Sequence, residues 1–209
     1  MLNLKISKVA ITGGLACGKS LVCRIFQRLG AHVVSADDII HQLLSHDTHL
    51  TQEIITLLGN DVVTDNQLDR KKIAQKVFSN PELLKALERL LHPKVKEIIE
   101  KQYQELEQQK TEKHGHPRLF IAEIPLLFEI GEEKSYDFVI AVIADENICR
   151  SRFSEATGYS DEEYTRRISR QLSQADKAKR ANAVIPNNFI SKEELEYPVK
   201  QLFNKLTIT

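Results

Sequence analysis

Two adjacent side chains, Lys19 and Ser20, have the types and the spacing needed to bind the phosphates of a nucleotide. Residues 13–20 read Gly-Gly-Leu-Ala-Cys-Gly-Lys-Ser and match the pattern G-x-x-x-x-G-K-[ST]. In such a loop the glycines let backbone N–H groups approach a phosphate, the lysine reaches the β- and γ-phosphates, and the hydroxyl binds Mg²⁺. The pattern predicts a catalytic Lys19, a metal-binding Ser20, and a nucleotide-binding loop made of Gly13, Gly14, Leu15, Ala16, Cys17, Gly18, Lys19, Ser20 and Leu21.

The segments on either side of residues 13–20 are those that a phosphate-binding loop requires. The apolar run Val9-Ala10-Ile11 before it is typical of a buried strand. After it, apolar residues recur at helical spacing as far as Leu29, and Gly30 is placed to end the helix. A glycine-rich turn without a ligand is the simpler alternative, and these flanking segments disfavour it. A dinucleotide-binding loop needs G-x-G-x-x-G, whereas residue 15 is leucine.

Composition limits the class of protein. The 209 residues suit one α/β domain, or a core domain with an inserted subdomain. The 29 basic and 29 acidic side chains balance, whereas nucleic-acid-binding proteins usually carry a basic excess. No apolar run approaches the length of a membrane span, and the N-terminus lacks the apolar core of a signal peptide. We therefore expect a cytoplasmic enzyme without a nucleic-acid or membrane partner.

A second candidate for chemistry follows the next predicted strand. Residues 31–35 read Ala-His-Val-Val-Ser, which is typical of a short strand, and they lead to Asp37 and Asp38. Ligands of a parallel sheet bind at the carboxyl ends of its strands. At that edge Asp37 could take a proton from an acceptor hydroxyl or hold Mg²⁺ through water. The alternative is a helix cap, and the two roles could be divided, with Asp38 as the cap.

A long helical segment follows. Residues 39–109 show an almost wholly helical pattern. Asn80 is placed to cap a helix that begins at Pro81, and Pro93 is expected to break it before a second helix starts near Lys94. Such a segment is far longer than an ordinary connection between strands. We interpret residues 39–110 as an acceptor-binding insertion; the alternative is an enlarged crossover that only covers the sheet.

Apolar runs along the chain predict an α/β fold of the P-loop type, in which helices flank a parallel sheet. The predicted strands are residues 9–11, 31–35, 119–124, 138–144 and 183–185. Glu123, near the end of the third strand, could hold Mg²⁺-bound water, or it could simply be a polar residue at the sheet edge. The polar segment 111–117 carries His114 and His116, and we expect a solvated loop there rather than a metal site.

Residues 146–180 form a charged helical stretch that is rich in arginine. Arginines that close over a nucleotide stabilise the charge on the phosphoryl group during its transfer. We therefore interpret residues 146–180 as a lid with its adjoining helix. The alternative is that most of these charges form a solvated helix face, which the interleaved Asp161, Glu162 and Glu163 favour.

Over nearly its whole length the chain resembles the dephospho-CoA kinase family, whose members are P-loop kinases related in fold to the nucleoside monophosphate kinases. The resemblance rests on the loop at 12–20, Ala36-Asp37, Leu68-Asp69-Arg70, Leu91-His92-Pro93, the Pro-Leu-Leu-Phe-Glu of residues 125–129, Gln171, and Ala181-x-x-Val184-Ile185-x-Asn187. It implies that ATP phosphorylates the ribose 3′-hydroxyl of dephospho-CoA, giving CoA and ADP in the last step of CoA biosynthesis.

The resemblance also implies roles for particular residues. Asp37 would be the catalytic base, and Arg150 and Asn187 would join the loop in binding ATP, with Mg²⁺ on Ser20. Further acceptor-binding residues would be Arg70, His92, Pro125 and Leu126. Family members commonly carry two lid arginines four residues apart, whereas this chain has Arg150 and Arg152.

Overall fold

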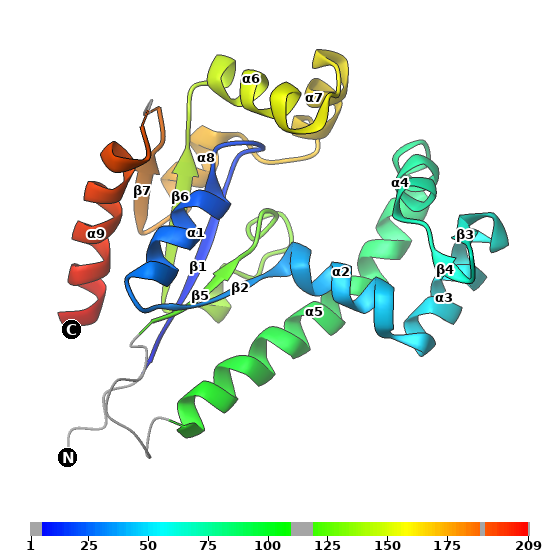
Figure 1. Ribbon diagram of the computed structural model, residues 1–209, viewed down its shortest axis with the longest axis horizontal. Helices are drawn as coiled ribbons and strands as arrows, with labels where there is room; N and C mark the ends of the chain where they lie inside the picture. The colour runs from blue at the N-terminus through cyan, green and yellow to red at the C-terminus, as the bar shows by residue number, and fades with distance from the viewer. Residues whose placement is uncertain (1–5, 110–118, 189–190, 209) are drawn as a thin grey trace. The chain divides into compact units, whose positions relative to one another are not determined.

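The computed structural model describes residues 6–109, 119–188 and 191–208 (Figure 1). The chain forms two compact units, one made of Met1–Ser35 with Glu105–Thr209 and the other of Ala36–Gln104. The first unit holds the large sheet, and the second consists mainly of helices. The loop predicted at 111–117 lies outside the described residues.

A five-stranded parallel sheet forms the centre of the first unit, which confirms the predicted fold class. The strands are β1 (Ser7–Gly13), β2 (His32–Ser35), β5 (Leu119–Glu123), β6 (Phe138–Ile143) and β7 (Ala183–Pro186). Their order is β2-β5-β1-β6-β7, and every neighbouring pair is parallel. The register pairs Glu123 with Ile11 on one side and with Ser35 on the other, so the carboxyl ends of three strands meet at one edge.

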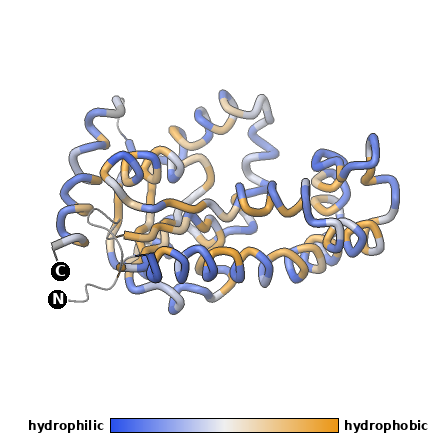
Figure 2. Tube along the Cα trace, turned by 60° about the horizontal axis from the view of Figure 1, so that its bottom comes forward, coloured by the Kyte–Doolittle hydropathy of each residue, from blue (hydrophilic) through white to orange (hydrophobic). Residues whose placement is uncertain are grey.

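Helices cover both faces of this sheet, which explains why its central strands are apolar. Val9, Ile11 and Ile121 are 0% exposed, and the central strands are largely orange in Figure 2, whereas the helices alternate between polar and apolar residues. The helices of this unit are α1 (Lys19–Arg28), α6 (Glu146–Thr157), α7 (Asp161–Ile168), α8 (Gln174–Arg180) and α9 (Lys192–Ile208), with a 3₁₀ turn, η2 (Glu133–Ser135). Helix α1 packs against α9, and α8 packs against β1 and β6. No described helix has the length and the apolar composition needed to span a membrane.

The second unit consists of three short helices, a small hairpin and most of one long helix. It contains α2 (Ala36–His46), α3 (Thr48–Leu58), η1 (Asn60–Val62), β3 (Val63–Thr64), β4 (Gln67–Leu68), α4 (Arg70–Phe78) and most of α5 (Pro81–Gln109). Side-chain caps set the helix starts. Asp47 accepts from the Leu50 N–H, and the Asn80 carboxamide accepts from the N–H groups of Glu82 and Leu83. The predicted cap at Asn80 is thereby confirmed.

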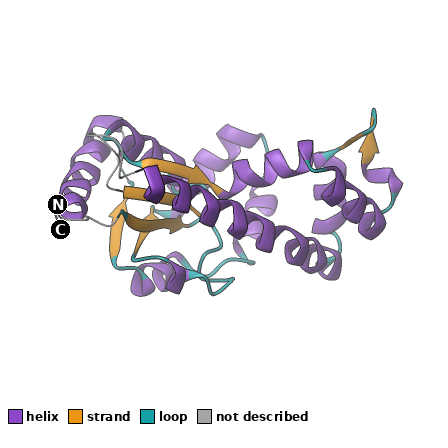
Figure 3. Ribbon diagram, turned by 90° about the horizontal axis from the view of Figure 1, so that it is seen from below, coloured by secondary structure: helices purple, strands orange, loops and turns teal. Residues whose placement is uncertain are grey.

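A small hairpin interrupts the helices of the second unit, where the sequence pattern predicted helix almost throughout. Strands β3 and β4 pair in antiparallel fashion around Asp65 and Asn66 (Figure 3). Both turn residues have left-handed backbones, with φ +50° and +61°. A two-residue hairpin turn of type I′ requires positive φ at both positions, and Asp and Asn tolerate it best after glycine. The Asp-Asn pair was therefore the local signal for this hairpin.

Helix α5 runs without a break through Pro93, so the predicted division at this residue is wrong. The side chains of Leu87, Leu91, Val95 and Ile99 are all buried, and they recur every four residues on both sides of the proline. One continuous apolar stripe can be buried only if the helix keeps its phase. Burial of this stripe outweighs the local cost of the proline.

Candidate nucleotide-binding site

Residues 13–20 form the loop that joins β1 to the N-terminus of α1. Gly18 has a left-handed backbone, with φ +88°, and a Cβ built on it would lie well inside 3.0 Å of the Asn187 amide nitrogen. A Cβ on Gly13 would likewise collide with the carbonyl of Val142 in β6. Both positions therefore require glycine. The N-terminus of α1 offers N–H groups and the positive end of a helix dipole, which together suit an anion.

The Lys19 ammonium is held by carbonyls of the loop itself. Its Nζ donates to the Gly14 carbonyl at 2.8 Å and lies 3.5 Å from the Gly13 carbonyl. A phosphate oxygen is a charged and therefore stronger acceptor for the same N–H groups. Nucleotide binding requires Lys19 to exchange these carbonyls for phosphate oxygens.

Ser20 and Glu123 bring two oxygen ligands together at the carboxyl edge of the sheet. The Ser20 hydroxyl donates to Glu123 Oε1 at 2.8 Å. Glu123 ends β5, next to β1, and is only 8% exposed. Mg²⁺ takes oxygen ligands, usually one or two from the protein together with water and phosphate oxygens. The pair therefore fits a magnesium site, which favours the metal-binding alternative for Glu123.

Asn187 supports the loop from the end of β7. Its side-chain amide donates to the Cys17 carbonyl at 2.8 Å, and its backbone N–H donates to the Ile143 carbonyl at 2.7 Å. Arg152 Nη1 donates to the Asn187 carbonyl at 3.0 Å, which brings this guanidinium close to Gly18. The family resemblance predicts that Asn187 binds ATP. That role stays a prediction, while the observed contacts hold the loop in place.

Arg150, the arginine expected to bind ATP, is paired within the segment 146–180. It bonds Glu146 at 2.6 Å and Asp161 at 2.7 Å, and its guanidinium lies 4.7 Å from the centre of the Tyr164 ring. The carboxylates of Asp161 and Glu146 raise the pKa of Arg150 above its ordinary value. These contacts join α6 to α7. Arg152 is therefore the arginine placed beside the loop, and the role of Arg150 in ATP binding stays a prediction.

Cys17 is fully buried beneath the loop. Its Sγ lies 3.5 Å from the Sγ of Cys149 and 3.0 Å from the Gln174 side-chain oxygen. The hydrogen bond with Cys149 lowers the pKa of Cys17 to about 7, aided by the charge of Lys19 and opposed by burial. The Cys17 side chain thus packs against both α6 and α8.

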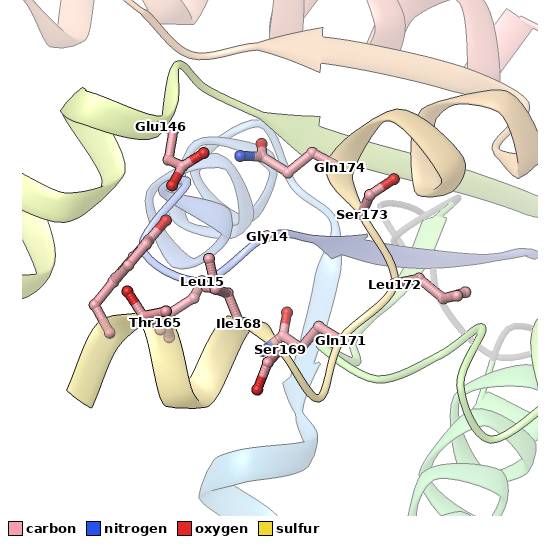
Figure 4. A pocket seen from close by; sticks show the side chains of 11 residues that line it. Gly14, Leu15, Glu146, Thr165, Ile168, Ser169, Gln171, Leu172, Ser173 and Gln174 are labelled. Carbon is pink, nitrogen blue, oxygen red and sulfur yellow. The ribbon is translucent and has the colours of Figure 1, made fainter. Parts of the chain in front are cut away.

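A pocket of about 410 Å³ lies beside the loop, within the first unit (Figure 4). The loop contributes Gly14 and Leu15, and the segment 146–180 contributes Glu146, Thr165 and Gln174 among others. In Figure 4 Thr165 approaches the loop from α7, Gln174 from α8 and Glu146 from the start of α6. The volume lies in the range of small-molecule pockets. The segment interpreted as a lid therefore borders the phosphate-binding loop.

Three of the residues that we expect to act on or bind the acceptor lie in the second unit: Asp37, Arg70 and His92. Helix α2 begins at Ala36, directly after β2, so Asp37 and Asp38 occupy its first turn. The alternative that one of them is the N-cap is wrong, because the helix starts earlier than the pattern indicated. Arg70 is the first residue of α4, and His92 lies in the middle of α5. Their catalytic and acceptor-binding roles stay predictions.

The two other expected acceptor residues, Pro125 and Leu126, follow β5 in the first unit. The Pro125 carbonyl accepts from the Thr12 hydroxyl at 3.1 Å and from Lys177 Nζ at 2.7 Å. Leu126 is half-buried. The observed contacts tie this turn to β1 and α8, and contact with an acceptor stays a prediction.

Sequence reasoning missed two residues of α8 that support the loop. The Gln174 side chain accepts from the Ala144 N–H at 2.9 Å and donates to the Ala144 carbonyl at 3.0 Å. Its oxygen also accepts a hydrogen bond from the Cys17 thiol. Lys177 lies in the charged stretch 146–180, for which a solvated helix face is one of the two interpretations, yet its side chain is 0% exposed. Gln174, Lys177 and Ala178 share one side of the helix by spacing. Because this side is not apolar, the hydrophobic pattern gave no signal for it.

The parallel sheet, the loop between β1 and α1, and the Ser20–Glu123 pair define a nucleotide-binding protein of the P-loop kinase class. Comparison with known proteins gives the family. The family model described as "Dephospho-CoA kinase" matches residues 7–193. The chain belongs to the dephospho-CoA kinase family, and the resemblance found in the sequence is confirmed.

Individual relatives agree over nearly the full chain. A protein named dephospho-CoA kinase from Protochlamydia amoebophila is 46% identical over 205 residues, which cover 98% of this chain and 98% of that protein. The solved structure of TT1252 from Thermus thermophilus is 32% identical with a TM-score of 0.79, covering 96% of this chain and 98% of that one. The dephospho-CoA kinase structure from Campylobacter jejuni is 26% identical with a TM-score of 0.63, covering 97% and 98%.

Proposed function

We propose that this chain transfers the γ-phosphoryl group of ATP to the ribose 3′-hydroxyl of dephospho-CoA, giving CoA and ADP. Family membership supports the acceptor. The single observation that carries the donor side is the 2.8 Å hydrogen bond between Ser20 and the buried Glu123, next to Lys19 on the same loop. A lysine that can bind phosphate therefore lies beside two oxygens that can ligate a metal ion, as transfer from ATP would require.

On the donor side, each group has a separate task. Ser20 and Glu123 would hold Mg²⁺, directly or through water. When bound there, Mg²⁺ would neutralise part of the negative charge of the transferring phosphate groups. Lys19 would move from the Gly14 carbonyl to the phosphate oxygens, and the N–H groups at the start of α1 would bind the phosphate. An arginine of the segment 146–180 would stabilise the charge of the transferring group.

On the acceptor side, Asp37 would orient the ribose hydroxyl and take its proton. The support is its place in the chain: Ser35 ends β2 in register with Glu123, and Asp37 follows Ser35 by two positions. The insertion at 39–110 would bind the rest of the acceptor, with Arg70 and His92 among its contacts and with Pro125 and Leu126 from the turn after β5. Closure of residues 146–180 would exclude water, which otherwise hydrolyses ATP.

An acceptor panel tests this proposal. Purified protein, ATP and Mg²⁺ are incubated with dephospho-CoA, with each nucleoside monophosphate, and with simple alcohols, and ADP release is measured. We expect dephospho-CoA to give the highest kcat/KM, and NMR of the product to place the new phosphate on the ribose 3′-oxygen. A Lys19→Met variant is the control that assigns turnover to this loop. Faster turnover of a nucleoside monophosphate, or ATP binding without turnover on any acceptor, would contradict the proposal.

A cytoplasmic location and the lack of nucleic-acid and membrane partners stay predictions from the sequence. The balance of 29 basic and 29 acidic side chains supports the prediction of no nucleic-acid partner, because it leaves no excess positive charge to bind a phosphate backbone.

A further inference from the structure

Lys177 places a fully buried ammonium beneath the phosphate-binding loop. It comes from α8 and is 0% exposed, whereas Lys179 on the same short helix is exposed. Burying a charge costs free energy unless the charge is paired and hydrogen-bonded. Lys177 lies next to the site but has no part in the mechanism above, and an apolar residue at this position would avoid the cost.

The ammonium of Lys177 is held by two groups of the turn after β5 and lies near two further oxygens. Its Nζ donates to the Pro125 carbonyl at 2.7 Å and pairs with Glu129 Oε1 at 2.9 Å. The Gly13 carbonyl and the Gln171 side-chain oxygen lie farther away, at 3.4 and 3.5 Å. Because an ammonium has only three N–H groups, the two short contacts fix its position and the two long ones share the third donor.

The Gly13 carbonyl, where β1 passes into the loop, therefore lies near two lysines. Lys177 Nζ is 3.4 Å from it and Lys19 Nζ is 3.5 Å from it. Lys19 must leave the carbonyl oxygens of the loop when it binds a phosphate. Lys177 keeps its ion pair with Glu129 and its hydrogen bond to Pro125. We propose that Lys177 is a positioning residue that keeps the Gly13 carbonyl hydrogen-bonded and so releases Lys19 to the phosphates. The inference rests on the proposed nucleotide binding by this loop and is independent of the acceptor.

The charges around Lys177 support the same positioning role. Burial lowers the pKa of Lys177, the ion pair with Glu129 opposes that shift, and the nearby charge of Lys19 adds to it. The two ammonium groups repel each other while Lys19 remains on the carbonyls. Movement of Lys19 onto an anionic phosphate relieves the repulsion. Glu129 also accepts from the Leu172 N–H at 2.8 Å, which holds the carboxylate in place for Lys177.

A double-mutant cycle in ATP affinity tests the proposal. The first change is Lys177→Met together with Glu129→Gln, because the second substitution avoids an unpaired buried carboxylate. Lys179→Met is the matched control on the same helix. The dissociation constant for ATP with Mg²⁺ is measured by calorimetry without any acceptor, so failure of the proposed acceptor does not affect it. Each variant is made with Lys19 present and with Lys19→Met.

With Lys19 present, we expect Lys177→Met/Glu129→Gln to weaken ATP binding about tenfold, the size of one charge-assisted hydrogen bond. In the Lys19→Met background the same change should alter the affinity less than about twofold, because its effect passes through Lys19. Lys179→Met should leave the affinity unchanged in both backgrounds. An equal loss in both backgrounds, or no loss with Lys19 present, would overturn the proposal.

Thermal unfolding checks that each variant is folded. If Lys177→Met/Glu129→Gln does not fold, Glu129→Gln alone is used, because it loosens the anchor of Lys177 and keeps the ammonium. We expect that variant to weaken ATP binding about threefold, a fraction of one such hydrogen bond, and only when Lys19 is present. A loss that does not depend on Lys19 would overturn the role of Lys177 in this case too.

Discussion

Replacing Gly18 by alanine should disrupt the phosphate-binding loop through two separate effects. The left-handed backbone at φ +88° costs an L side chain about 1–2 kcal/mol. The new Cβ would also displace the Asn187 amide from the Cys17 carbonyl, which it now meets at 2.8 Å. Leaving such buried groups unpaired costs about 1–3 kcal/mol. The sum predicts a loss of about 2–5 kcal/mol in the free energy of unfolding.

Gly158→Ala is the matched control for the backbone effect. Gly158 ends α6 with φ +70°, and no heavy atom among the described residues lies within 4 Å of a Cβ built there. The free energy of unfolding of this variant should fall by only about 1–2 kcal/mol, which is the cost of the left-handed backbone. The variant should bind ATP as the unsubstituted protein does. Gly18→Ala should in addition weaken ATP binding at least about tenfold, because the loop N–H groups move. Urea denaturation and calorimetry measure the two quantities.

The reasoning fails if the two alanine variants lose the same free energy and both bind ATP normally. A third variant isolates the contact with Asn187. Asn187→Ala removes the hydrogen bond to Cys17 but also removes the atom that collides with the new Cβ. The double variant Gly18→Ala/Asn187→Ala should therefore lose less free energy than the sum of the two single variants. A strictly additive result would show that the collision contributes nothing.

Three further experiments test the proposed roles of single residues. Asp37→Asn should lower kcat about a hundredfold or more while the ATP dissociation constant stays within about twofold, as expected for a general base; steady-state kinetics with normal turnover would refute the assignment. Glu123→Gln keeps an acceptor for Ser20 but removes the charge, so the Mg²⁺ concentration for half-maximal activity should rise about tenfold; a Mg²⁺ titration that matches the parent protein would argue against a metal site. Arg152→Met should raise the KM for ATP more than Arg150→Met does, because Arg152 lies beside the loop while Arg150 is paired with Glu146. If Arg150→Met raises the KM for ATP more than Arg152→Met does, Arg150 is the arginine that binds ATP, as the family resemblance implies.

The sheet and the loop could be predicted because their signals are local. Residues 13–20 carry a complete motif, and each core strand is an apolar run whose ends in the structure fall within two residues of the predicted ones. The hairpin at β3 and β4 had a local signal too, in Asp65 and Asn66, but the surrounding helical pattern concealed it. Hydrophobic periodicity describes long segments better than turns of two residues.

The support beneath the loop could not be predicted, because it depends on contacts between distant parts of the chain. Lys177 reaches the Gly13 carbonyl across 164 positions, and Asn187 reaches the Cys17 carbonyl across 170. In the sequence Lys177 is one of several lysines and arginines in a charged helix, and those are usually solvated. Only the sheet order, which places α8 against β1 and β6, distinguishes this lysine from its neighbours.

Pro93 shows how packing overrides a local rule, and it yields a prediction about stability. Pro93 has no N–H to offer the carbonyl of Arg89, yet α5 continues because Leu91 and Val95 are buried on either side of the proline. Pro93 itself is exposed, so Pro93→Ala restores the helical hydrogen bond without losing packing. Interior proline costs about 3 kcal/mol relative to alanine, so we expect urea denaturation to show a gain of about 1–3 kcal/mol in the free energy of unfolding. Pro198→Ala in α9 gives a second interior position for comparison. A Pro93→Ala variant that is less stable than the parent would mean that the proline shapes a bend on which the burial of Leu91 and Val95 depends.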